Sequence, residues 1–267
     1  MVNILSAPRS TRGFEPYAES FPFHNTYNTT HGGRPANKYS LETNQPLVLG
    51  GQEDLNPNDL CRMENHLLLQ IIGKPAYLLA HNGMTTYACA EAVEFRALAK
   101  GATLFRFGAS DDLEPGLFDP GSNFDLPKIY RECQSTFRDR YIWNLVSQGL
   151  VSEVVWFKST PGRDFISGDG NRFREAFPGV KIDSFDEREI AGFDRGRAAN
   201  LLAKNILLHI DYNYFKGLRH EYMFSTADLI KFLFRRAGLV VQALSPEFFK
   251  SDPLYPAHLA IDLMTSL

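Results

Sequence analysis

The stretch LHIDYNYFKG, from Leu208 to Gly217, decides how the rest of the chain is interpreted. Residues typical of a buried strand lead directly into Asp211, and Asn213 follows two residues later on the same face. Aspartate is depleted from strands, and a buried carboxylate lowers stability unless something pairs with it. A metal ion is one such partner, so the stretch predicts a polar site at the end of a core strand.

The composition is that of an ordinary globular protein and argues against several functional classes. The chain has 267 residues, 44% of them hydrophobic and 22% charged, which suits one large α/β domain or two small ones. A net charge of -3 argues against nucleic-acid binding through broad electrostatics. No apolar run approaches the ~20 residues that span a bilayer, and the first residues lack the apolar core of a signal peptide. Three cysteines without CxxC spacing fit a reduced protein, so we expect a cytoplasmic location and neither a nucleic-acid nor a membrane partner.

The chain divides into an N-terminal extension over residues 1–73 and an α/β domain over residues 74–267. The extension is rich in Asn, Thr, Gly and Pro and is expected to be irregular structure packed on the core. Within it, PLVLGG predicts a short strand, and NDLCRMENHLLLQIIG over residues 58–73 predicts a helix that ends at a glycine.

From residue 74 onward, strand patterns alternate with helix patterns. This alternation indicates βαβ units, and we expect a three-layer αβα fold with a mostly parallel, doubly wound sheet. The expected strands cover residues 76–81, 103–108, 152–158, 180–185, 206–211 and 239–245. The expected helices cover residues 85–101, 137–150, 195–205, 225–238 and 252–264, with a Ser/Thr cap predicted for the fourth.

Polar side chains gather where the expected strands end. Ligands of open parallel sheets bind beyond the carboxyl ends of the strands, so these side chains are expected along one edge. A histidine nitrogen together with carboxylate oxygens suits Mn, Fe or Zn. Taken singly, each of these residues could instead form a turn, cap a helix or be an ordinary hydrogen-bonded polar group. Only their occurrence together at one edge indicates a site. The candidates are His81, Asn82, Asp111, Asp112, Glu114, Asp211, Asn213 and Glu247. His209 lies deeper in its strand, and we interpret it as a core residue.

The ordered segments resemble a known family. LLAHN, FRFGASDDLEPG, GLVSEVVWFKSTPG, LLHIDYNYF and LSPEFF follow one another as in the arginase/ureohydrolase superfamily. Residues 74–267 look most like the arginase-like branch that includes peptide arginases, which convert arginine side chains of a peptide to ornithine. The resemblance implies an arginase-like fold, a manganese hydrolase of C–N bonds, and a small-molecule or peptide substrate. It leaves a homo-oligomer open.

The resemblance also implies a set of metal ligands. The superfamily's dinuclear manganese centre uses one His, a D-x-H-x-D segment and a D-x-D segment at a strand end. His81 matches the first ligand, Asp112 the last acid of the second segment, and Asp211 the first acid of the third. These three would hold one divalent ion, with Mn or Fe foremost and Zn open.

The remaining positions depart from the family pattern. Gly108, Ser110 and Asn213 stand where further ligands are expected, so the second metal would be lost. The resulting single-metal site would use Glu247 and Asp111 as its catalytic residues, whose carboxylates polarise a water or hold a cationic substrate group. Its predicted substrate-binding residues are Glu114, Asn82 and Asn213.

Three functions therefore stay open. The first is a metal-dependent hydrolase that acts on a guanidino or amide group, such as an arginine side chain in a peptide. The second is a mononuclear-metal enzyme with altered chemistry, for example oxidative chemistry at iron. The third is an inactive arginase-fold protein that binds a peptide or a partner.

Overall fold

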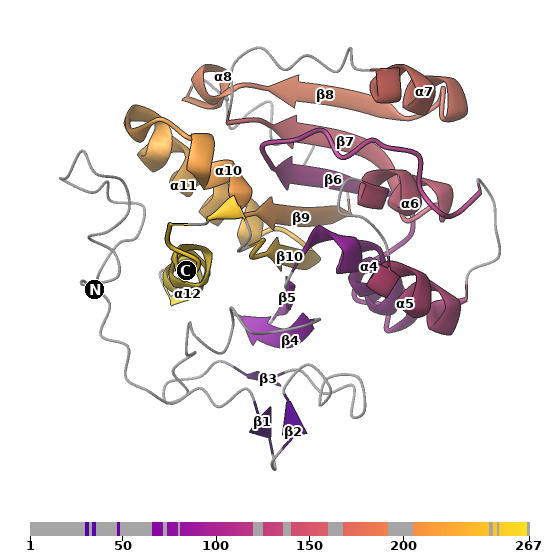
Figure 1. Cartoon of the computed structure of the whole chain (residues 1–267), viewed down its shortest axis with the longest axis horizontal. Helices are drawn as coiled ribbons and strands as arrows, with labels where there is room; N and C mark the ends of the chain where they lie inside the picture. Colours follow the sequence, from indigo (N-terminus) through magenta and orange to yellow (C-terminus); the bar gives the residue numbers. More distant parts are fainter. Residues whose placement is uncertain are drawn as a thin grey trace.

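Figure 1 shows a computed structural model of the chain. The structure describes residues 30–31, 34–35, 47–48, 66–71, 74–79, 81–119, 125–135, 140–159, 168–191, 205–245, 248–249 and 251–265.

An eight-stranded sheet forms the centre of the fold, in the order β3-β4-β5-β10-β9-β6-β7-β8. The six strands from β5 to β8 are parallel, and Figure 1 shows β6, β7, β8 and β9 with their arrowheads on the same side. β4 is antiparallel to β5, and β1 and β2 form a separate antiparallel pair. The bounds are β1 (Thr30–His31), β2 (Arg34–Pro35), β3 (Leu47–Val48), β4 (His66–Ile71), β5 (Lys74–Leu79), β6 (Ala102–Phe107), β7 (Val151–Phe157), β8 (Lys181–Phe185), β9 (Ile206–Asp211) and β10 (Leu239–Ala243).

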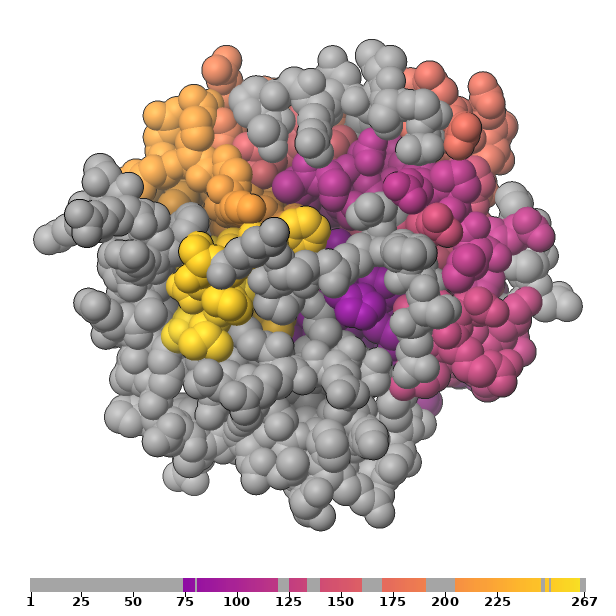
Figure 2. All heavy atoms as spheres, viewed as in Figure 1, coloured from indigo at the N-terminus to yellow at the C-terminus, as the bar shows by residue number. Residues whose placement is uncertain are grey.

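Helices cover both faces of the sheet. One face of the sheet carries an apolar cluster that includes residues of α4, α5, α6 and α7. The other face carries a second cluster that includes residues of α8, α10, α11 and α12. On the side drawn in Figure 2, α11 (orange) lies next to α12 (yellow). The bounds are η1 (Asn82–Met84), α4 (Thr85–Glu94), α5 (Leu126–Ser135), α6 (Tyr141–Ser147), α7 (Gly168–Ala176), α8 (Glu187–Ala191), α10 (Asn213–Gly217), η3 (His220–Tyr222), α11 (Met223–Phe234) and α12 (Tyr255–Thr265).

The central strand β9 shows why the sequence folds in this way. All six of its residues are buried, and successive side chains point to opposite faces. Leu207 therefore packs in the cluster of α4 to α7, whereas Leu208 and Ile210 pack in the cluster of α11 and α12. A strand covered on both faces needs a nearly continuous apolar run, as found here. The α/β class and the three-layer αβα arrangement are confirmed.

The prediction for residues 58–73 is wrong where the structure describes it. His66–Ile71 form β4, which pairs along its whole length with β5. A short apolar run fits a strand or a buried helix equally well, and here the free edge of β5 offered a hydrogen-bonding partner. β4 belongs to the predicted extension, so the sheet continues across the predicted boundary at residue 73. The predicted strand in PLVLGG is confirmed as β3.

Two further helix predictions need correction. Residues 126–135 form α5, although the sequence analysis predicts no helix between residues 101 and 137. α11 begins at Met223 with no side-chain cap, so the expected Ser/Thr cap is wrong and Ser225 and Thr226 lie inside the helix. The helix expected over residues 195–205 falls almost entirely outside the described residues.

No helix among the described residues is long and apolar enough to cross a membrane.

Candidate functional site

The carboxyl ends of four neighbouring strands line up at one edge of the sheet. Leu79 of β5 is in register with Ala243 of β10, and Ala243 with Asp211 of β9. Ile210 is in turn in register with Phe107 of β6. Residues that follow these positions therefore reach the same edge, as expected from the parallel sheet.

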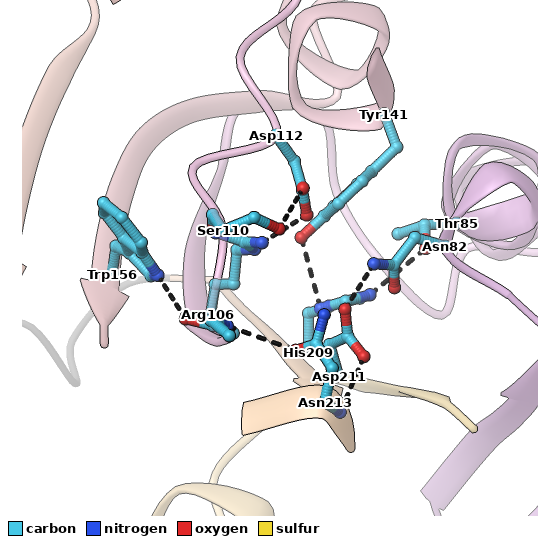
Figure 3. A network of polar contacts seen from close by, with 12 residues as sticks. Asn82, Thr85, Arg106, Ser110, Asp112, Tyr141, Trp156, His209, Asp211 and Asn213 are labelled. Carbon is cyan, nitrogen blue, oxygen red and sulfur yellow. Dashed lines mark hydrogen bonds and ion pairs between the residues drawn. The ribbon is translucent and has the colours of Figure 1, made fainter. Parts of the chain in front are cut away.

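Asp211 is fully buried and held by two asparagines (Figure 3). The side-chain amide of Asn82 donates to Asp211 Oδ2 at 2.5 Å, and the backbone N–H of Asn213 donates to Oδ1 at 3.0 Å. Asn213 Oδ1 accepts from the backbone N–H of Ala109 at 3.1 Å, which joins the start of α10 to the loop after β6. The two asparagines predicted to bind substrate thus support Asp211.

The environment of Asp211 disfavours its charged form. Burial, and then the nearby Asp112 carboxylate, raise the pKa of Asp211 to about 7, although its hydrogen bonds and the Arg106 guanidinium act in the opposite direction. The carboxyl is therefore poised between its neutral and charged forms near neutral pH.

A buried ion pair occupies the other half of the site. Arg106, the next-to-last residue of β6, is fully buried, and its Nη2 donates to Asp112 Oδ2. Its Nη1 donates to the carbonyl of Ser110, whose hydroxyl donates to Asp112 Oδ1 at 2.6 Å. The guanidinium carbon lies 5.6 Å from the ring centre of Tyr141 and 5.5 Å from that of Trp156. Both oxygens of Asp112 are therefore bonded within the chain.

His209 is part of the same network. Thr85 Oγ1 lies 3.2 Å from its Nε2 and the Tyr141 hydroxyl 3.3 Å from its Nδ1, and the Tyr141 ring stacks on it at 4.8 Å. Burial and the nearby Arg106 charge hold the pKa of His209 well below its usual value. The histidine is neutral and buried, as its interpretation as a core residue predicted.

The remaining candidates lie at the rim or outside the described residues. His81 caps η1, because its Nδ1 accepts from the backbone N–H of Gly83 at 3.1 Å. Glu114 is partly exposed and forms an ion pair with Arg140 at 3.5 Å. Asp111 is partly buried. Glu247 lies outside the described residues.

The residues present do not fit the expected metal centre. In the part of the chain that the structure describes, no three His, Cys, Asp or Glu side chains form a group that could hold a metal ion. The four carboxylate oxygens of Asp112 and Asp211 each accept a hydrogen bond from the protein. His81 Nδ1 is also engaged. The divalent ion implied by the family resemblance stays a prediction.

Arg106 and Tyr141 are the site residues that sequence reasoning missed. A usable signal was present, because Arg106 is the charged residue within an otherwise apolar strand, TLFRFG, and a buried charge requires a partner. Tyr141 gave no such signal, since a tyrosine in an amphipathic helix fits ordinary packing.

Comparison with models of known protein families gives no match, and neither does a search of curated proteins.

Proposed function

We propose that the protein binds a group rich in hydrogen-bond donors, such as the guanidino or amide group of a peptide side chain, at the strand-end site and does not hydrolyse it. The observation that carries this proposal is the amide of Asn82, which is 2% exposed. Its nitrogen donates to Asp211, and its oxygen has no hydrogen-bond partner. A buried acceptor without a donor costs about 1–3 kcal/mol, and a donor-bearing ligand would remove this cost.

A second polar group at the same edge supports the proposal. The hydroxyl of Ser245 is buried and has no hydrogen-bond partner. Ser245 follows β10, which lies between the strands that lead to Asn82 and Asp211. Its backbone is in the left-handed region with a φ of 47°, and Asp112 has a φ of 51°. Non-glycine residues in this region are uncommon and gather at functional sites.

The arrangement favours binding over metal-dependent hydrolysis. Metal-assisted hydrolysis requires a water or hydroxide activated by an ion in a site with an open position. Here the oxygens of Asp112 and Asp211 are directed to protein donors. The function supported best is thus the binding alternative among the three that the sequence left open.

Calorimetric titration of the full chain tests the proposal. The ligands are an arginine-containing peptide, a glutamine-containing peptide, and an otherwise identical peptide with leucine at that position. We expect binding of the first or second peptide and at least a tenfold loss of affinity in Asn82→Ala. The matched control, Asp183→Ala on edge strand β8, should bind as the wild type does. Equal binding of the leucine peptide, or full affinity in Asn82→Ala, would refute the proposal.

Turnover assays with the same peptides distinguish the other two functions. We expect no release of urea or ammonia with Mn²⁺ and no oxygen consumption with Fe²⁺. Urea or ammonia release would establish the hydrolase instead, and oxygen consumption would establish the oxidative enzyme.

A further inference from the structure

Two buried polar atoms at adjacent strand ends have no hydrogen-bond partner among the described residues. They are Oδ1 of Asn82, which follows β5, and Oγ of Ser245, which follows β10. The two strand ends are joined, because the backbone N–H of Leu244 donates to the carbonyl of Leu79 at 2.9 Å. Asn82 and Ser245 therefore leave the same edge of the sheet from neighbouring strands.

The orientation of the Asn82 amide follows from its partner. The amide nitrogen donates to Asp211 Oδ2 (Figure 3), and an ionised carboxylate can only accept hydrogen bonds. A flipped amide would set two oxygens against each other, so the nitrogen faces Asp211 and the oxygen is the remaining acceptor. The hydroxyl of Ser245 can rotate, and it can donate or accept. The edge thus offers one acceptor and one group able to donate.

The charges of the site argue against the binding of a second guanidinium. Tyr141 lies beside both halves of the site, with its ring centre 5.6 Å from the guanidinium carbon of Arg106 and 4.8 Å from the ring centre of His209. A further guanidinium presents only donors and stays charged when buried, so it requires carboxylate oxygens as partners. The oxygens of Asp112 and Asp211 already accept hydrogen bonds from the protein. A neutral ligand avoids this conflict.

We propose that the strand-end site selects a neutral primary carboxamide, such as a glutamine side chain of a peptide, over a guanidinium. The N–H of the carboxamide donates to Asn82 Oδ1, and its carbonyl accepts from the Ser245 hydroxyl. Both unpartnered atoms are thereby paired, and no charge is added to a buried site. This inference rests on the proposed function and narrows the ligand of the same site.

Calorimetric titration of the full chain compares peptides that differ at one position, which holds glutamine, arginine, glutamate γ-methyl ester or leucine. The ester keeps the carbonyl of glutamine but has no N–H donor. We expect the glutamine peptide to bind about tenfold or more tighter than the arginine and ester peptides. Equal or tighter binding of the arginine peptide would overturn this inference and leave the proposed function standing. No preference for any polar peptide over leucine would refute both.

A citrulline peptide isolates the effect of charge. Citrulline has the length of arginine but ends in a neutral ureido group with a carbonyl, so it can use both Asn82 and Ser245. It should bind about tenfold more tightly than the arginine peptide. Equal affinity of these two peptides would contradict the role of charge in the selection.

Substitution Ser245→Ala tests the second contact and separates binding from a structural role. A buried hydroxyl without a partner does not stabilise the free protein, so the melting temperature should not fall. The affinity for the glutamine peptide should fall about tenfold or more. The matched control is Ser152→Ala, at an exposed position near the amino end of β7, which should bind as the wild type does. Unchanged affinity in Ser245→Ala, or a clearly lower melting temperature, would overturn the assignment of this hydroxyl to the ligand.

Discussion

Gly108 shows how a single absent side chain shapes the site. The family resemblance placed an acidic metal ligand at this position, and the structure places the Arg106 guanidinium against it instead. Glycine is needed here for space, since its φ is not in the left-handed region. The site thus depends on the pair formed by Arg106 and Gly108.

Substitution Gly108→Ala should destabilise the protein. The new methyl group would meet the guanidinium at 2.7–2.8 Å and force it away from Asp112. We expect a loss of about 1–3 kcal/mol in the free energy of unfolding, as for other cases of overpacking. Urea denaturation gives this value. Gly179→Ala is the control, because a Cβ there meets no atom within 4 Å, and an equally small effect of both substitutions would contradict the account of Gly108.

At the scale of the element, α4 is fixed to the sheet by a buried carboxyl. Glu91 accepts hydrogen bonds from the hydroxyls of Tyr87, at 2.7 Å in the same helix, and of Tyr77 in β5. Burial raises the pKa of Glu91, while the two hydroxyls act against this shift. Because η1 leads directly into α4, this contact also positions Asn82 beside Asp211.

Glu91→Ala should therefore lower stability by about 2–4 kcal/mol, since two buried hydroxyls lose this acceptor. Glu94→Ala, an exposed position at the end of the same helix, should change stability by less than about 0.5 kcal/mol. Urea denaturation compares the two. Similar values for both variants would show that Glu91 does not anchor the helix.

The C-terminal helix α12 should make stability depend on pH. Burial lowers the pKa of His258 to about 4, although the nearby Asp252 carboxylate acts in the opposite direction. The unfolded histidine has a pKa of about 6.5, so below that pH only the unfolded chain gains the proton. The stabilising contribution is complete above pH 6.5 and is lost progressively as the pH falls towards 4.

We expect this histidine to account for about 1–3 kcal/mol of the stability lost between pH 7 and pH 4. Urea denaturation of His258→Gln across this range should show a correspondingly weaker pH dependence. His220→Gln, at an exposed position in η3, should behave as the wild type does. A pH dependence unchanged in His258→Gln would argue against the buried neutral histidine.

At the scale of the whole molecule, the sequence was enough to predict the three layers of the fold and the edge of the sheet at which the candidate site lies. The apolar run that ends at Asp211 fixed the position of β9, and the strand-end rule brought Asn82, Asp112 and Asp211 to one network. β4 was not predictable, because its apolar run fits a helix equally well and only pairing with β5 decided it.

The partner of Asp112 could not be deduced from its own segment. Nothing in GASDD shows that an arginine four residues before Ser110 folds back onto the same loop. A contact between a strand side chain and the loop that follows the strand depends on how the loop folds back, which the sequence alone does not show. The family pattern predicts metal ligands at these positions and gives no reason to expect an arginine there. The contact between Arg106 and Asp112 is therefore visible only in the structure.

Nuclear magnetic resonance of arginine-labelled full chain tests the central claim most directly, namely that a buried guanidinium is the cation of the site. The account predicts slowly exchanging guanidinium protons from one arginine, absent in Arg106→Lys and shifted in Asp112→Asn. Guanidinium protons that all exchange with water as fast as those of free arginine would contradict it.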